Sequence, residues 1–163
     1  MRTLLAFFCL AVLLTGCAGI PFNAASVQPG TPRDAVIARL GQPGRVVRLP
    51  AGGERLQYSL QPLGRQAWMV DLDAAGRVVS ARQALTLDNF NRIEPGKWTR
   101  DDVEREFGRP AMIDGVASWD GPILTYRWAD GADLFYWVYL DRNNIVRRAH
   151  QGMEFFNAPN DRN

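Results

Sequence analysis

The chain has 163 residues, 47% of them hydrophobic, which is enough apolar material for a buried core and argues against disorder throughout. Lysine and arginine exceed aspartate and glutamate by only two (19 − 17). Because nucleic-acid binding requires clustered basic residues, this balance gives no support for such a function. The length suits one or two small domains.

The amino terminus has the pattern of a secreted, lipid-modified protein. Arg2 precedes an apolar run, residues 4–14, that is too short to span a bilayer as a stable helix. The next residues, Leu14-Thr15-Gly16-Cys17, resemble the bacterial lipobox, in which cleavage before the cysteine leaves its sulfur to carry diacylglycerol. We therefore predict a signal peptide over residues 1–16 and lipidation of Cys17. The alternative is an ordinary signal peptide with an incidental cysteine.

Lipidation of Cys17 has consequences for the mature chain. Cys9 leaves with the signal, so Cys17 has no partner for a disulfide. Two or more acyl chains anchor a protein stably to a membrane surface without a transmembrane helix. The next residue is Ala18 and not aspartate, which by the sorting rule for enterobacterial lipoproteins implies the periplasmic face of the outer membrane. Residues 17–28 are predicted as a tether.

A short pattern that occurs twice organises the remainder of the chain. Residues 36–43 read VIARLGQP and residues 103–110 read VEREFGRP, 67 positions apart (103 − 36). In each copy, apolar residues four apart mark one helix face, glycine suits the left-handed position that ends the helix, and proline prevents its continuation. Further on, Tyr58 and Tyr126 begin a series of matches that are 68 apart (126 − 58). We interpret residues 29–85 and 86–153 as two copies of one unit, with a tail over residues 154–163.

Each copy is predicted to begin with a helix and to continue with antiparallel strands. Thr31 is a candidate N-cap with Pro32 at the first helical position, and Thr99 takes the same role in the second copy. Turn residues and alternation predict strands over residues 45–49, 55–60, 67–73 and 77–85, and over residues 111–113, 116–119, 123–128, 134–141 and 145–151. Charged positions on the second helix, including Glu104 and Glu106, are assigned to its solvated side.

Alternation separates the two faces of the strand over residues 134–141. It sends Tyr136, Val138 and Leu140 inward and leaves three aromatic residues on the opposite face, namely Phe135, Trp137 and Tyr139. The first copy offers Ala67, Met69 and Asp71 at the corresponding positions. Because exposed aromatic residues are costly, either a partner binds Phe135, Trp137 and Tyr139, or the chain covers them itself through the first copy or through Phe155 and Phe156.

The repeated residues carry a resemblance to a known family. Gly30, Val36, Leu40-Gly41-x-Pro43, Tyr58 and the hairpin that ends at Val78, with their counterparts from Gly96 to Val146, resemble the SmpA/OmlA (BamE-like) family of outer-membrane lipoproteins. The resemblance implies an α+β fold: a tandem repeat of a short helical pair packed on one face of a three- to four-stranded antiparallel sheet. Tandem units of similar topology occur in the beta-lactamase inhibitory protein, where the joined sheets present a concave face to a target enzyme.

The sequence gives little support for an enzyme, a metal site or a cofactor. His150 is the one histidine, no serine has a nucleophile-elbow context, and there is no Cys/His cluster or phosphate-binding glycine loop. Residues 71–76 resemble a calcium loop faintly, but the ligand positions fail and a turn is favoured.

Two functional hypotheses follow from this reading. The first is a non-enzymatic outer-membrane lipoprotein that binds an envelope protein and supports outer-membrane protein assembly or envelope integrity. The alternative is a lipid-tethered inhibitor or ligand-binding module that acts on a periplasmic enzyme or a glycan.

Overall fold

The computed structural model describes residues 24–154. The predicted lipidation site, Cys17, and the two candidate covering residues, Phe155 and Phe156, lie outside the described residues. We refer to residues 24–85 as the first half and to residues 86–154 as the second half. None of the helices in the described range is long and apolar enough to cross a membrane.

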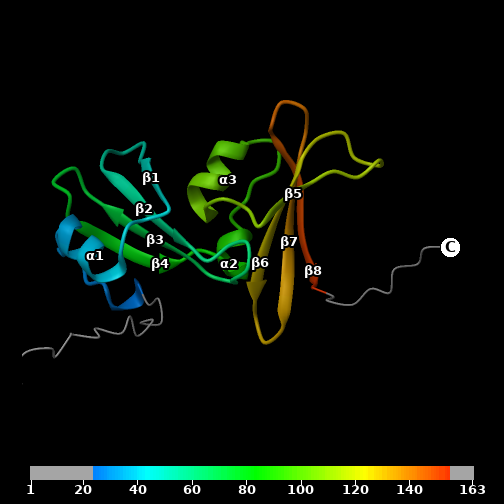
Figure 1. The fold of residues 1–163 in the computed structure, drawn as a ribbon. Helices are drawn as coiled ribbons and strands as arrows, with labels where there is room; N and C mark the ends of the chain where they lie inside the picture. The colour runs from blue at the N-terminus through cyan, green and yellow to red at the C-terminus, as the bar shows by residue number, and fades with distance from the viewer. Residues whose placement is uncertain (1–23, 155–163) are drawn as a thin grey trace, which may run out of the picture.

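Two four-stranded antiparallel sheets, each with its strands in sequence order, make up most of the molecule (Figure 1). The first sheet consists of β1 (Arg45–Arg48), β2 (Glu54–Ser59), β3 (Ala67–Leu72) and β4 (Val78–Gln83). The second consists of β5 (Met112–Asp114), β6 (Ile123–Ala129), β7 (Asp133–Leu140) and β8 (Val146–Met153). The helices are η1 (Ala24–Ser26), α1 (Arg33–Leu40), α2 (Leu87–Phe90) and α3 (Arg100–Phe107).

The predicted fold class, a helical pair packed on one face of each sheet, is wrong. The molecule is mostly sheet, with 40% strand and 18% helix. The helix beside α1 is a single turn, η1, and the helix beside α3 is α2, which has four residues. Segments this short bury little apolar surface by themselves, so the strands supply most of the core. The predicted strand at residues 116–119 is also wrong, because these residues form a loop between β5 and β6.

The elements stack in the order α1, first sheet, α2 with α3, second sheet (Figure 1). One apolar cluster joins η1 and α1 to the first sheet and includes Val36, Leu56 and Val70, each with no exposed area. A second cluster joins Met69 of β3 to Phe90 of α2, Val103 and Phe107 of α3 and the inner face of the second sheet. Because side chains of β3 alternate between faces, the first sheet is covered on both sides.

Matched contacts join each long helix to its sheet. The Tyr58 hydroxyl donates to the carbonyl of Gly41 (3.1 Å), and the Tyr126 hydroxyl donates to that of Gly108 (2.9 Å). Both glycines have φ near +81°, a region that disfavours other residues. The sheets share a further irregularity, since the register shifts between residues 71 and 72 in β3 and between residues 139 and 140 in β7.

The start of α3 is better fixed than the start of α1. A capping box closes α3, with the Thr99 hydroxyl accepting from the Asp102 N–H (3.2 Å) and the Asp102 carboxylate accepting from the Thr99 N–H (2.8 Å). In α1 the cap position is Pro32, which offers no side-chain hydrogen bond. The predicted cap at Thr31 is therefore wrong by one residue, and its hydroxyl donates to the carbonyl of Gln28 instead.

The loop between β2 and β3 connects the first half to the second sheet. The Gln61 side-chain amide donates to the carbonyl of Arg127 (2.8 Å) and accepts from the N–H of Arg127 (3.0 Å). In the same region, Arg65 donates to the Glu154 carboxylate (3.2 Å). These contacts fix the first half against β6 and the end of β8.

Candidate functional site

The outer face of the second sheet carries the residues that the sequence singled out. On β7, Tyr136 is 5% exposed and Val138 and Leu140 are fully buried, so these three point toward α2 and α3. Phe135, Trp137 and Tyr139 alternate with them and are partly exposed on the other face. The alternation predicted for β7 is therefore confirmed. Whether this face binds a partner stays a prediction.

Strand pairing brings further residues to the same face. Trp137 lies opposite His150, and Tyr139 lies opposite Arg148. Ring centroids are 5.7 Å apart for Phe135 and Trp137, 5.4 Å for Trp137 and His150, and 5.2 Å for His150 and Tyr139. We call the following set the aromatic face: Trp119, Arg127, Phe135, Trp137, Tyr139, Arg148 and His150.

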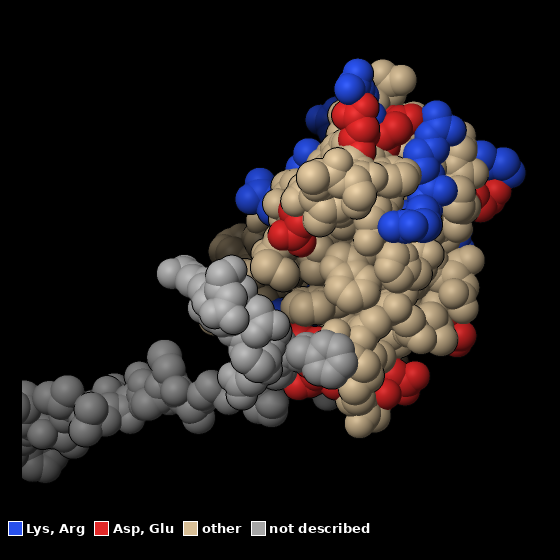
Figure 2. All heavy atoms as spheres, turned by 90° about the vertical axis from the view of Figure 1, so that its right-hand side faces the viewer, with Lys and Arg blue, Asp and Glu red and all other residues tan. Residues whose placement is uncertain are grey.

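Figure 2 shows this side of the molecule. A largely uncharged area lies between basic side chains on one side and acidic side chains at the lower edge.

Two arginines lie on the rings at opposite ends of the aromatic face. The Arg148 guanidinium carbon is 4.0 Å from the centroid of Tyr139, and that of Arg127 is 5.8 Å from the centroid of Phe135. Arg127 also pairs with the Glu154 carboxylate at 2.7 Å. Within residues 24–154, Arg148 has ring contacts but no carboxylate partner. The donors of Arg148 therefore remain available to another molecule.

Local packing fixes the positions of the two tryptophans. The Trp137 ring lies across β8 above Gly152, where a β-carbon would come within 2.6 Å of the ring. Trp119 is held by a hydrogen bond from its indole N–H to the carbonyl of Leu140 (2.8 Å), and it meets Tyr139 edge to face. The rings are thus ordered before any partner arrives, which lowers the entropy lost on binding.

His150 lies between Trp137 and Tyr139, with its ring nearly parallel to that of Tyr139. Partial burial lowers the pKa of His150, and the positive charge of Arg148 lowers it further. The imidazole is therefore neutral near pH 7, which suits stacking between two uncharged rings.

Sequence reasoning found three members of the aromatic face and missed four. Trp119 was assigned to a strand that does not form. Arg148 and His150 reach the face because β8 pairs with β7 across the turn at residues 141–144. The register of this hairpin was the signal in the sequence that could have identified them. Arg127 reaches the face from β6, opposite Phe135.

The corresponding face of the first sheet is closed by α3. The Gln57 side-chain amide donates to the carbonyls of Glu104 and Arg105, both at 3.0 Å. Arg55 pairs with Asp71 (2.5 Å) and with Glu106 (2.7 Å), and Arg82 donates to Glu106 (2.6 Å). The assignment of Glu104 and Glu106 to a solvated helix side is therefore wrong, because their side chains are only 12% and 17% exposed.

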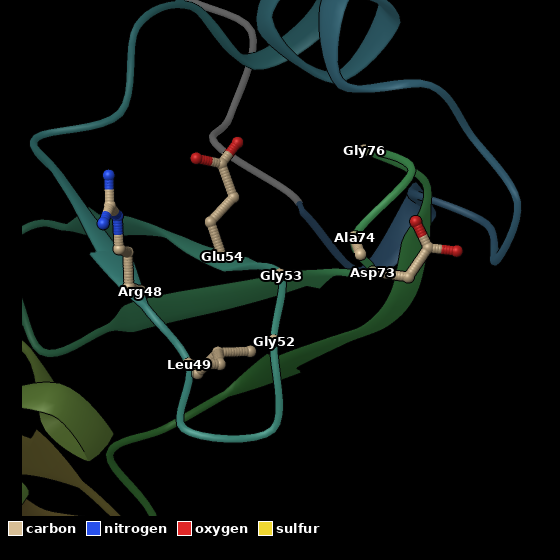
Figure 3. Close-up of a pocket in the computed structure, with 8 residues that line it drawn as sticks. All are labelled: Arg48, Leu49, Gly52, Gly53, Glu54, Asp73, Ala74 and Gly76. Atoms are coloured by element: carbon tan, nitrogen blue, oxygen red, sulfur yellow. The ribbon is translucent and has the colours of Figure 1, made fainter.

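A hollow near the hairpin turns of the first sheet shows no convergent set of reactive groups. It has a volume of about 420 Å³, and in Figure 3 Arg48 and Glu54 point to one side of it while Asp73 turns away. Glu54 pairs with Arg33 (2.6 Å). Asp73 accepts from the N–H groups of Ala75 and Arg77 in its own turn. Within the described residues no group of three possible metal-binding side chains occurs.

Comparisons with known proteins give little information about this chain. No protein-family model matches the sequence, and no curated protein matches it. Among solved structures, the chain is similar to the crystal structure of YjgB, a DUF4309 family protein from Bacillus subtilis, at 15% identity over 76% of this chain and 79% of that one, with a TM-score of 0.30. A TM-score this low does not establish a common fold, and the resemblance to the SmpA/OmlA family stays a prediction.

Proposed function

We propose that this protein is a non-enzymatic outer-membrane lipoprotein that binds another protein of the cell envelope through the aromatic face. The observation that carries the proposal is the ordered group of Trp137, Tyr139 and Arg148 on the outer side of the second sheet. Tryptophan, tyrosine and arginine are the residue types that contribute most of the binding energy at protein interfaces. Rings held by stacking and by Gly152 lose little conformational freedom when they are covered.

The environment of the titratable groups supports a binding role over a catalytic one. Acid–base catalysis requires a base within hydrogen-bond reach of its substrate and usually a third group that orients the base. The neighbours of His150 on the aromatic face are aromatic rings and a cation. The carboxylates of Asp71, Glu104 and Glu106 form ion pairs that join the two halves or the strands of one sheet.

The proposed lipid anchor limits where the partner lies. Ala24, the first residue of η1, lies seven positions after Cys17 in the sequence (24 − 17). A chain of that length spans at most about 25 Å when fully extended. The proposed anchor would therefore hold η1 and the first sheet, against which η1 packs, near the membrane surface, and the partner would lie on the other side of the molecule, at the second sheet.

Trp137→Ala tests the binding role. We expect a co-purifying envelope protein to be lost from detergent-solubilised membranes, with little change in melting temperature, because Trp137 is already partly exposed. Val79→Ala is the matched control, since Val79 is 59% exposed on the first sheet. A large fall in melting temperature, or full retention of the partner, would contradict the proposal. Recovery of a soluble periplasmic enzyme or a polysaccharide would favour the inhibitor or ligand-binding alternative.

Cys17→Ala tests the anchor separately. We expect the variant to lose its acyl chains by mass spectrometry and to move from the membrane to the soluble fraction. Unchanged processing and membrane association would exclude the lipoprotein.

A further inference from the structure

We propose that the partner contributes a short helix with an acidic side chain, docked on the aromatic face as α3 docks on the first sheet. This inference rests on the proposed function and specifies the partner that it requires. Within residues 24–154, α3 already covers one face of the first sheet in this way.

The interface between α3 and the first sheet has two parts. Its apolar part is Met69, which is fully buried and lies near the carboxyl end of α3 at Gly108. Its polar part is the Glu106 carboxylate, which accepts from Arg55 and Arg82. The helix α3 therefore covers this sheet face through two neighbouring contacts. One is an apolar contact with the sheet, and the other joins a helix carboxylate to arginines of the sheet.

The second sheet offers the apolar part at the matched position, 68 residues further along the chain, and a cation close to it. Trp137 takes the place of Met69 (137 − 69), whereas the places of the two arginines, Arg82 and Arg55, are taken by the uncharged residues His150 (150 − 82) and Ile123 (123 − 55). Arg148 is two residues from His150 on β8 and lies on the same face, opposite Tyr139. The face thus has an apolar centre with a cation beside it, but the covering helix and its carboxylate are not supplied by residues 24–154.

Charge complementarity favours a carboxylate beside Arg148. Arg127 is already paired with Glu154, whereas Arg148 is held over Tyr139 with its guanidinium donors unused by any carboxylate of the described chain. A carboxylate brought beside Arg148 on an apolar surface gains a charge-assisted hydrogen bond away from bulk water. If Arg148 lies near the carboxyl end of the helix, the helix dipole adds to this attraction.

A second copy of this chain does not supply such a helix. Its α3 is already enclosed between the two sheets, so only α1 could take the matched role. In α1 the residue that corresponds to Glu106 is Arg39 (106 − 67). Docking α1 in the same way would bring Arg39 toward His150 and the neighbouring Arg148, and two like charges repel each other. The occupant is therefore a helix of a different protein.

The test places the photo-crosslinking residue p-benzoylphenylalanine at Phe135 of the full-length lipoprotein, in its native host. Replacing the partly exposed Phe135 by another aromatic residue leaves the core intact. p-Benzoylphenylalanine at Val79, on the exposed side of β4, is the control for nonspecific crosslinking. Crosslinked peptides are identified by mass spectrometry. The secondary structure at each crosslinked residue is then read from the structure of the partner protein.

We expect the crosslinked residue to lie in a helix of another protein, with an aspartate or glutamate within one turn of it. Arg148→Glu should reduce the crosslink yield at least tenfold, and Arg148→Lys should retain most of it. Replacing the partner's acidic residue by arginine should restore the yield in the Arg148→Glu background, which a merely structural role of Arg148 would not do.

Each other outcome overturns a defined part of the proposal. A crosslink to a strand or an irregular loop of another protein overturns the docked helix and leaves the proposed function intact. A crosslink to a second copy of this chain overturns the choice of a different protein. Crosslinking to polysaccharide alone, or no crosslink above the Val79 control, overturns both the inference and the proposed protein-binding function.

Discussion

The two sheets present the same face to different surroundings. On the first sheet, Ala67 and Met69 are fully buried beneath α2 and α3. On the second sheet, the matched residues Phe135 and Trp137 are partly exposed, and no helix lies over them within the described range. One strand arrangement therefore serves as an internal layer in one half and as an outer surface in the other.

The side chains on the two corresponding faces differ in size, and this fits the difference in cover. Ala84, at the end of the first sheet, allows α2 to come close, so that the Asn89 amide donates to the carbonyls of Gln83 and Ala84, both at 3.1 Å. From the sequence alone, the aromatic excess on the second face was compatible with a bound partner or with cover by the chain itself. The structure gives the contrast a physical origin, because small residues on the first sheet permit close helix packing.

The comparison can be tested most strongly at the centre of the enclosed layer. Phe90 is fully buried and its ring contacts those of Phe107, Trp128 and Tyr136. We expect Phe90→Ala to lower the free energy of unfolding by about 3–5 kcal/mol, measured by urea denaturation. The control, Phe135→Ala on the open face, should cost less than about 1.5 kcal/mol. Equal costs would mean that the two faces do not differ as described.

The second test removes the charge that binds α3 to the first sheet. Glu106→Gln leaves Arg82 without its carboxylate and weakens the network around Arg55, whose side chain is only 6% exposed. We expect a loss of about 1–3 kcal/mol of unfolding free energy. Asp101→Asn, on the exposed side of the same helix, should change it by less than about 0.5 kcal/mol. A Glu106 effect no larger than the Asp101 effect would show that this ion network does not hold the layers together.

A smaller, pH-dependent contribution to stability is expected at the start of α3 and not at the start of α1. Burial alone would raise the pKa of Asp102, but hydrogen bonds from the Thr99 N–H, the Thr99 hydroxyl and Arg105 together lower it. A carboxyl whose pKa is lower in the folded state stabilises that state fully above its unfolded pKa and loses this contribution as the pH falls through the folded pKa.

Asp102→Asn should therefore cost about 0.5–1 kcal/mol at pH 7, measured by urea denaturation. The difference from the unmodified protein should narrow below about pH 4, the ordinary range of an aspartate. A difference that is independent of pH would exclude the charge of Asp102 as the cause. Helix α1, with proline at its cap position, has no equivalent group.

The smallest effect on stability, and the most specific effect on the open face, is expected at Gly152. In Gly152→Ala the new methyl group would overlap the Trp137 ring, which must move toward solvent. We expect less than about 0.5 kcal/mol of destabilisation, a red shift of tryptophan fluorescence, and reduced partner recovery. Gly115→Ala is the control, because a β-carbon there meets open space. An unchanged spectrum would mean that Trp137 does not lie across Gly152.

Local signals in the sequence predicted much of the strand arrangement. The alternation of β7 and the helix ends at Gly41 and Gly108 follow from side-chain period and backbone preference, which depend only on near neighbours. The burial of Arg55 and Gln57 could not be predicted in this way. Polar residues in an alternating strand indicate a solvent-facing side, but α3, about 50 residues away, covers them.

The same limit explains the error in fold class and the incomplete site. Which layer covers which sheet depends on contacts between distant segments, and the short α2 leaves almost no periodic pattern to detect. Three members of the aromatic face share one strand and could be found by alternation. Arg127, Arg148 and Trp119 come from other segments and required the pairing register or the path of a loop.

The Gln61 amide gives the molecule a mechanical property. It makes two hydrogen bonds to the backbone of Arg127, as a neighbouring strand would, and so joins the first half to β6. The loop that carries Gln61 lies at the same end of the first sheet as the covalent connection at residues 84–86, because the Ala84 N–H donates to the carbonyl of Ala67 at the end of this loop. A pulling force applied to the second sheet would thus be shared between this side-chain bridge, the Arg65–Glu154 pair and the chain itself. If the proposed partner and the proposed lipid anchor pulled in opposite directions, these contacts would make the two halves resist separation as one body.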